Sequence, residues 1–257
     1  NGNYLVVCEK AGRDTTEDFI VELDGTTGMK VREWDLKETY KMNNYVGNPI
    51  YKYNEHDWLH INSIWPVPGE DAILVSGRHQ DGFFKLDLAK NEIVWAMTAP
   101  DEDFTEEFSS KLLTPIGEDF EYVWGQHAIS MLPDGKIFVF DNGNGRSKDP
   151  NEFWAVGDTR NYSRAVIYRV DEKNMTVEQV WQYGKERGTE LFSSYICDVD
   201  YLGPNHYLLD FGGTRQGADR SISKATIIEI KDEEIIWELK LDTNRYRAER
   251  MSAYEFD

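Results

Sequence analysis

Residues 125–146 read GQHAISMLPDGKIFVFDNGNGR, and this stretch decides the expected fold. A Pro-Asp-Gly turn at 133–135 lies between two short apolar runs. Proline presets φ and glycine tolerates a positive φ, so the tripeptide predicts a hairpin of two antiparallel strands. In such a hairpin the start of the first strand and the end of the second lie at one edge. We therefore expect His127 to lie beside Asn142 and the glycine-rich loop that leads to Arg146.

The rest of the chain repeats this unit of a hairpin, a third strand and an outer strand that carries a tryptophan. Besides the strand that begins at His127, we expect strands at 3–8, 18–23, 30–36, 60–67, 72–77, 83–88, 92–97, 136–141, 164–170, 176–183, 196–202, 206–211, 225–230 and 234–241. The tryptophans are Trp34, Trp95, Trp181 and Trp237, and we expect them to pack between units. Four-stranded units of roughly 40–50 residues are typical of a β-propeller. The first unit lacks its leading strand, which the tail at 245–251 could supply.

Length and composition fit this all-β interpretation. The chain has 257 residues, which suffices for one large all-β domain or two small ones, and its 8 Trp, 14 Tyr and 12 Phe can fill a large core. No apolar run approaches the ~20 residues that span a membrane. The formal charge of -19 argues against a nucleic-acid or anionic-membrane partner, because either needs a basic face. Solubility is the commonest reason for such a charge.

The cysteines and the first residues say little about the compartment. Cys8 and Cys197 are far apart in the sequence, and no CxxC or His/Cys cluster suggests zinc. One disulfide or two free thiols both remain open, with free thiols favoured. The chain opens with Asn-Gly and no initiator Met, which we interpret as a processed or truncated N-terminus.

The repeat places several polar side chains at one mouth of a central channel, because the first strand of each propeller blade lines that channel. Three histidines and three arginines from three repeats then share the mouth. In an acidic protein this indicates an anionic ligand, since arginine binds oxyanions through parallel hydrogen bonds. The expected mouth residues are His60, Asn62, Arg78, His79, His127, Asn142, Arg146 and, in the loop 212–217, Arg215.

Other kinds of site are not favoured. Few carboxylates are expected in the cluster, so we predict no metal site of the histidine and carboxylate type. Paired acids for glycoside hydrolysis, a GxSxG elbow and a Walker loop are missing from the sequence. We therefore expect no cofactor.

Five segments resemble a known family. They are 60–64 (HINSI), 76–80 (SGRHQ), 126–127 (QH), 140–146 (FDNGNGR) and 162–188 (YSRAVIYRVDEKNMTVEQVWQYGKERG), with 246–251 (YRAERM) near the end. Together they resemble the bacterial arylsulfate sulfotransferases over nearly the whole chain. That family has a six-bladed β-propeller and an N-terminal β-sandwich. About four blade repeats are visible here, so the resemblance implies that residues 1–257 form a propeller domain without the sandwich and the first blades.

The resemblance implies transfer of a sulfuryl group from a phenolic sulfate ester to a phenol acceptor, in a ping-pong reaction through a sulfohistidine. It assigns catalytic roles to His60, His127 and Arg146, and implies a periplasmic or otherwise extracytoplasmic location and a homodimer as one assembly. The family's covalent histidine follows a later Gly-Gly, but residues 211–217 here read FGGTRQG. We favour His127 as the nucleophile, because His206 begins its strand at the far edge.

The expected roles at the mouth follow from this reaction. Arg146, with Arg215 as a second donor, would hold the sulfuryl oxygens. His60 and His127 would hydrogen-bond ester oxygens or shuttle the phenolic proton. The remaining substrate contacts would come from Asn62, Arg78, His79 and Asn142. The alternatives are a non-catalytic propeller that binds aryl sulfates or other anions in its mouth, and an unrelated propeller function such as a scaffold.

Overall fold

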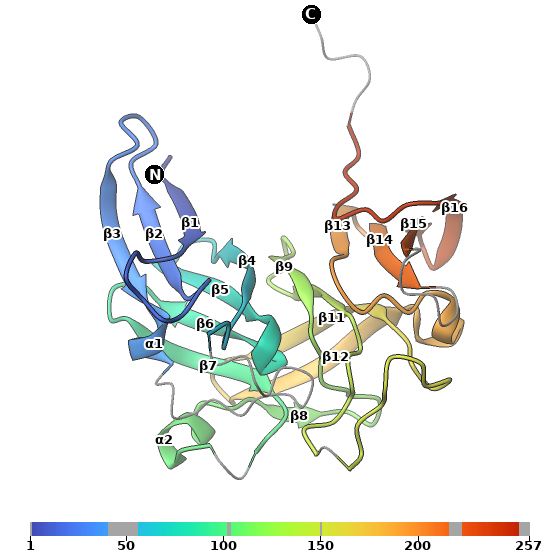
Figure 1. The fold of residues 1–257 in the computed structure, drawn as a ribbon, viewed down its shortest axis with the longest axis horizontal. Coiled ribbons are helices and arrows are strands. Elements are labelled where there is room, and N and C mark those ends of the chain that lie inside the picture. Colours follow the sequence, from blue (N-terminus) through green and yellow to red (C-terminus); the bar gives the residue numbers. More distant parts are fainter. Residues whose placement is uncertain (1, 41–55, 102–103, 150, 216–222, 252–257) are drawn as a thin grey trace, which may run out of the picture.

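Figure 1 shows the computed structural model, which describes residues 2–40, 56–101, 104–149, 151–215 and 223–251. Nearly all of its regular structure is β, in four sheets that follow one another along the chain. The first sheet has β1 (Tyr4–Cys8), β2 (Phe19–Leu23) and β3 (Lys30–Asp35). The second has β4 (Ile61–Pro66), β5 (Ala72–Gly77), β6 (Gly82–Asp87) and β7 (Glu92–Thr98).

The third sheet has the order β8-β12-β11-β10-β9, and the fourth the order β13-β14-β15-β16. The bounds in the third are β8 (Thr114–Ile116), β9 (His127–Met131), β10 (Ile137–Asp141), β11 (Arg164–Asp171) and β12 (Thr176–Tyr183). Those in the fourth are β13 (Asp198–Gly203), β14 (His206–Arg215), β15 (Ser223–Lys231) and β16 (Glu234–Leu241). Short helices are α1 (Leu36–Thr39), α2 (Glu106–Ser109), η2 (Arg78–Gln80) and η3 (Lys185–Glu190).

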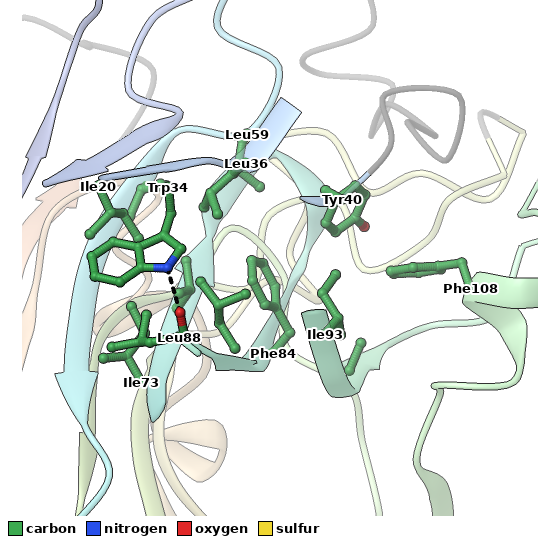
Figure 2. Close-up of a cluster of buried hydrophobic side chains, with 14 of the residues drawn as sticks. Ile20, Trp34, Leu36, Tyr40, Leu59, Ile73, Phe84, Leu88, Ile93 and Phe108 are labelled. Atoms are coloured by element: carbon green, nitrogen blue, oxygen red, sulfur yellow. Dashed lines mark hydrogen bonds between the residues drawn. The ribbon is translucent and has the colours of Figure 1, made fainter. Parts of the chain in front are cut away.

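The strands of the inner sheets are buried on both faces, and alternate side chains supply two different cores. On β10, Ile137 and Val139 pack against the second sheet, whereas Phe138 and Phe140 pack against the fourth. Because side chains alternate across a strand, a continuous apolar run fills the layers on both of its sides. Each sheet thus stacks on the next, as propeller blades do. Figure 2 shows the core between the first and second sheets.

The tryptophans behave as expected in three of the four sheets. In Figure 2 the Trp34 indole donates to the Leu88 carbonyl of the second sheet, at 2.9 Å. Trp95 is buried in the core between the second and third sheets. Trp181 stacks on Tyr207 of the fourth sheet, with ring centres 4.7 Å apart. Trp237 is 40% exposed, since no described sheet lies beyond β16. The prediction of packing between units is confirmed for the first three and wrong for Trp237.

The all-β fold class is confirmed, with four sheets arranged as consecutive blades around an arc (Figure 1). The loop at 212–217 and the tail differ from expectation, and one further segment contains regular structure. The predicted loop at 212–217 is, up to Arg215, part of β14, because Gly212 and Gly213 leave room for the tail and for Tyr195 rather than making a turn. The tail at 245–251 forms no strand. The segment 99–123 contains α2 and β8, and β8 pairs with β12 in parallel.

Two simpler expectations concern cysteines and membranes. Cys8 and Cys197 are both free thiols, and Cys197 is buried. No helix among the described residues is long and apolar enough to cross a membrane. Residues 37–56 are polar and carry no strand pattern in the sequence, and most of them lie outside the described residues.

Candidate active site at the channel mouth

A cavity of about 640 Å³ lies between the first strands of the second, third and fourth sheets. It is lined by residues 62–65 of β4, 128–133 of β9 and its turn, 198–201 of β13, and Arg247 and Glu249 of the tail. Figure 1 shows these three strands side by side at the centre of the arc. A second cavity of about 680 Å³, between the first two sheets, contains none of the predicted site residues.

The backbone is left-handed where each of these strands begins. The φ angle is 51° at His60, 55° at Ala128 and 97° at Cys197, just before β4, in β9 and just before β13. Non-glycine residues seldom adopt positive φ, and such residues are concentrated at functional sites. The three strands therefore share a turned start, which falls at His60 itself, directly after His127 and directly before Asp198.

His127 is held by Asn142, as the hairpin predicted. Its Nδ1 lies 2.7 Å from Asn142 Oδ1, and the ring is 4% exposed. The Asn142 amide nitrogen donates to the carbonyls of Ser193 and Ile196, at 2.8 and 3.0 Å. These bonds fix Oδ1 toward the ring, so Nδ1 carries the proton and Nε2 carries the lone pair. Burial, with the charge of Arg78, lowers the pKa of His127 to about 3.

His60 and His79 form a second imidazole group, above Asp57. Their ring centres are 4.6 Å apart, and His60 Nδ1 lies 2.7 Å from Asp57 Oδ2 and 3.0 Å from Glu17 Oε2. His79 Nδ1 donates to the Asp57 carbonyl, and its Nε2 accepts from Arg78 at 3.1 Å. Burial, with the Arg78 charge, lowers the pKa of His79 to about 4. Arg78 is thus the arginine whose charge acts on the mouth imidazoles.

Carboxylates are more common at this mouth than the sequence suggested. Asp57 and Glu17 contact His60, and Asp198 begins β13 and lines the cavity. The expectation that few carboxylates join the cluster is wrong. The fold brings Glu17 and Asp57 to the start of β4, and their spacing in the sequence did not indicate this. Asp57 with the two histidines has donor atoms within 4.8 Å of one another, close enough for a metal. A metal there would have to displace both Nδ1 hydrogen bonds, and the absence of a metal stays a prediction.

Arg146 lies in the interior beneath the glycine loop. Nη1 is 3.3 Å from Asp141 Oδ2, Nη2 donates to the Tyr162 carbonyl at 2.9 Å, and the guanidinium carbon lies 3.4 Å from the Tyr162 ring centre. Asp141 also binds the buried Arg164 at 2.9 Å. The contacts described for Arg146 are therefore to Asp141 and Tyr162, and not to the histidines. Its role in binding sulfuryl oxygens stays a prediction.

The other predicted residues divide between the cavity and the undescribed loop. Asn62 lines the cavity and donates to the Gln126 carbonyl at 2.6 Å, which joins β4 to β9. Arg215 ends β14, where its backbone pairs with Ser223, and its side chain is outside the described part of the chain. His206 lies at the other end of β14, opposite Gly203, with Nε2 2.6 Å from Glu229.

Besides Glu17 and Asp57, the sequence did not indicate three further residues at the mouth. Asp198 begins β13, as His127 begins β9, and Asp210 is opposite Asp198 on β14. The signal for Asp198 is its place at the start of the first strand of a repeat. Tyr246 of the tail lies edge-on to His127, with ring centres 6.4 Å apart. No signal in the sequence fixed the path of the tail.

The sheets and the cavity between their first strands define a blade-repeat β protein with a polar channel mouth. The sequence model of the Arylsulfotransferase (ASST) family matches residues 1–254, so the chain belongs to this family. It is 32% identical over 216 residues to the arylsulfate sulfotransferase AssT of Escherichia coli O6:H1, and 31% identical over 218 residues to that of Lelliottia amnigena. These alignments cover 75% and 76% of this chain.

The chain spans about a third of the length of these curated relatives, 35% of each. Similar solved structures include a protein of unknown function from Bacteroides caccae, with 12% identity and a TM-score of 0.40 over 93% of this chain and 73% of that one. Another is the hydrazine synthase of Kuenenia stuttgartiensis, with 10% identity and a TM-score of 0.39 over 84% and 58%. Likeness at this level carries no argument about fold or function.

Proposed function

We propose that this chain carries out sulfuryl transfer from a phenolic sulfate ester to a phenol, with His127 as the residue that becomes sulfated. The carrying observation is the fixed, neutral imidazole of His127, whose Nδ1 faces Asn142 Oδ1 at 2.7 Å. A nucleophilic imidazole must be unprotonated, and the depressed pKa of His127 keeps it so at neutral pH. Family membership supports the reaction class.

Bonds and charges balance in both half-reactions. His127 Nε2 donates its lone pair to sulfur, the bond from sulfur to the aryl oxygen breaks, and phenolate leaves with the electron pair. Asn142 offers a neutral amide oxygen, which does not take the Nδ1 proton, so the sulfated ring is positively charged. In the second half, the acceptor oxygen attacks sulfur, and the electron pair of the nitrogen–sulfur bond returns to Nε2. The positive charge makes the ring a good leaving group.

The oxygens of the sulfuryl group need positive charge and donors around them. Sulfuryl transfer resembles loose phosphoryl transfer, in which positioning and oxygen stabilisation contribute most. Arg78 supports this role, since its charge lowers the pKa of both His127 and His79. His60, held by Asp57, would donate to or accept from an ester oxygen. Arg146 would act from beneath the glycine loop.

Release of 4-nitrophenol from its sulfate ester tests the proposal, with and without added phenol. We expect a burst of about one equivalent without acceptor and continuous release with phenol. Peptide mapping of the trapped protein should place an acid-labile sulfuryl group on His127. Treatment with a chelator should change neither result. A modification on His206 would contradict the assignment of the mouth.

A non-catalytic anion-binding propeller is the second candidate. The favouring observation is the strand segment Phe211 to Arg215, which holds no histidine after its Gly-Gly pair. Tight binding of an aryl sulfate without burst or modification would select this function over transfer.

A further inference from the structure

Asp198 and Asp210 form a carboxyl pair where β13 begins. They are direct partners across β13 and β14, so their side chains share one face with Cβ atoms roughly 4.5–5.5 Å apart. Asp198 lines the cavity, and Asp210 lies behind it with 1% of its surface exposed. Asp198 begins β13, as His127 begins β9 in the third sheet.

Asp210 is the more deeply buried acid of the pair, with 1% of its surface exposed against 7% for Asp198. Both Asp210 carboxylate oxygens are buried without a hydrogen bond among the described residues. Asp198 is near one cation, with Oδ2 3.4 Å from Arg247 Nε. A buried carboxylate without donors is unfavourable in its charged form, so the pair must hold either a cation or a proton. Among the described residues, no third His, Cys, Asp or Glu joins the pair at metal-ligand distance, which leaves the proton.

The surroundings of the pair raise the pKa values of both carboxyl groups toward neutral pH. Burial, with the charge of Asp200, raises the pKa of Asp198 to about 7. Burial, with the charge of Asp198, raises the pKa of Asp210 to about 7. The other charged groups that act on the pair are Arg245, Arg247 and Glu249 of the tail, and they divide between the two signs.

Two of the mouth imidazoles, those of His127 and His79, are not available to hold this proton. The pKa values of His127 and His79, about 3 and about 4, leave both rings neutral across the pH range of most enzymes. Transfer between phenols nevertheless requires that the acceptor lose a proton and that the departing phenolate gain one. The tail links His127 and Asp198, because Tyr246 lies against His127 and the next residue, Arg247, lies against Asp198.

We propose that Asp198, sharing one proton with Asp210, is the group that exchanges protons with the aryl oxygens in the cavity. In the first half-reaction the pair gives its proton to the departing phenolate oxygen and becomes doubly charged. In the second half it takes the proton of the acceptor phenol while that oxygen attacks sulfur. One proton thus moves from acceptor to leaving group in each cycle. This inference rests on the proposed function and assigns its acid and base.

The test compares Asp198→Asn and Asp210→Asn in the full chain, with Asp232→Asn as control. Asp232 lies in the turn between β15 and β16, in the same sheet but away from the cavity. With phenyl sulfate as donor, the rate of the sulfation burst should fall about 10²-fold in the two pair variants, in line with loss of a general acid. With 4-nitrophenyl sulfate, whose phenolate is a weaker base, the loss should be smaller. Transfer to phenol should lose its dependence on pH between about 5 and 8 in both variants.

Infrared difference spectra between pH 5 and pH 8 give a readout that needs no activity. The unaltered chain and Asp232→Asn should show the carbonyl stretch of a buried carboxylic acid at pH 5, and both pair variants should lose its titration. If the unaltered chain shows the titrating band but the pair variants keep its kinetics, the catalytic use of the pair is overturned and the shared proton is not. No titrating band would overturn the shared proton. No burst in the unaltered chain would instead overturn the proposed function, and with it this use of the pair.

Discussion

The first strands of the third and fourth sheets hold their titratable groups in opposite ways. On β9, His127 has its Nδ1 proton bound by Asn142, whose amide is itself fixed by two backbone carbonyls. The strand β13 begins with Asp198, whose partner Asp210 has no donor for either oxygen among the described residues. Hydrogen bonds thus fix the proton at His127, whereas no described hydrogen bond fixes one at Asp210.

This difference matches what the two roles require. A nucleophile needs one protonation state and one tautomer, which hydrogen bonds and a nearby positive charge provide. A proton carrier needs two accessible states near the working pH, which burial of paired carboxyl groups provides. The start of a first strand can therefore supply either function, depending on whether the neighbouring side chain is an amide or an acid.

The largest effect is expected from replacing the nucleophile. His127→Gln should reduce transfer from 4-nitrophenyl sulfate to phenol by on the order of 10³-fold or more, because the covalent route is lost. His206→Gln should leave transfer near the starting rate, since His206 bonds Glu229 at the far end of β14. Initial rates, with circular dichroism to confirm folding, make the measurement. Equal rates in the two variants would reverse the assignment of the mouth.

Stability should depend on pH through the acid pair. The folded pKa values of about 7 lie above the ordinary value near 4, so the folded chain binds more protons than the unfolded chain between pH 4 and 7. The free energy of unfolding should therefore fall as pH rises through this window, by about 4 kcal/mol for one group. Urea denaturation at pH 5, 6, 7 and 8 makes the measurement.

The matched comparison is Asp210→Asn against Asp232→Asn. Asp210→Asn should flatten the fall in stability and leave the protein more stable than the unaltered chain at pH 8. Asp232→Asn should retain the fall. A stability that rises from pH 5 to 8 in the unaltered chain would show that the pair is charged in the folded state.

The sequence predicted the repeat well because turn residues and short apolar runs are local properties. The hairpin at 125–146 placed His127 beside Asn142, and that contact is present. Arg146 was less predictable, because Asp141 and Tyr162 draw its side chain into the interior, and neither contact is visible in the repeat. The tail was unpredictable for a related reason. Its path depends on the room that Gly212 leaves beside β14, which is a property of packing and not of periodicity.

The mouth arginines should differ in what they support. Arg78→Ala should weaken binding of an aryl sulfate about tenfold or more, as expected for a lost charge-assisted hydrogen bond. It should also raise the pKa of His127 and His79, because the Arg78 charge lowers both. Titration calorimetry and histidine NMR measure the two effects. Lys136→Ala is the control, since Lys136 pairs with Asp134 in the turn.

The variant Arg146→Ala tests whether the second arginine contributes to anion binding, to stability or to both. We expect it to weaken anion binding more than Lys136→Ala, and also to lower the melting temperature, because its guanidinium holds Asp141 and Tyr162. Arg78→Ala should lower the melting temperature less. A stability loss in Arg146→Ala without any loss of binding would limit that arginine to a structural role.

The smallest effect is expected from loosening the His127 ring. Asn142→Ala should slow the sulfation burst about tenfold, because the proton of the neutral ring is then free to occupy either nitrogen and a buried hydrogen bond is lost. The matched control is Asn161→Ala, another buried asparagine, which bonds the Ala155 carbonyl at 2.6 Å. Nitrogen-15 NMR should show the Nδ1–H tautomer of His127 in the unaltered chain and in Asn161→Ala, and a mixture in Asn142→Ala. If the tautomer and the burst survive Asn142→Ala unchanged, the amide does not position the nucleophile, and the contrast with the acid pair rests on burial alone.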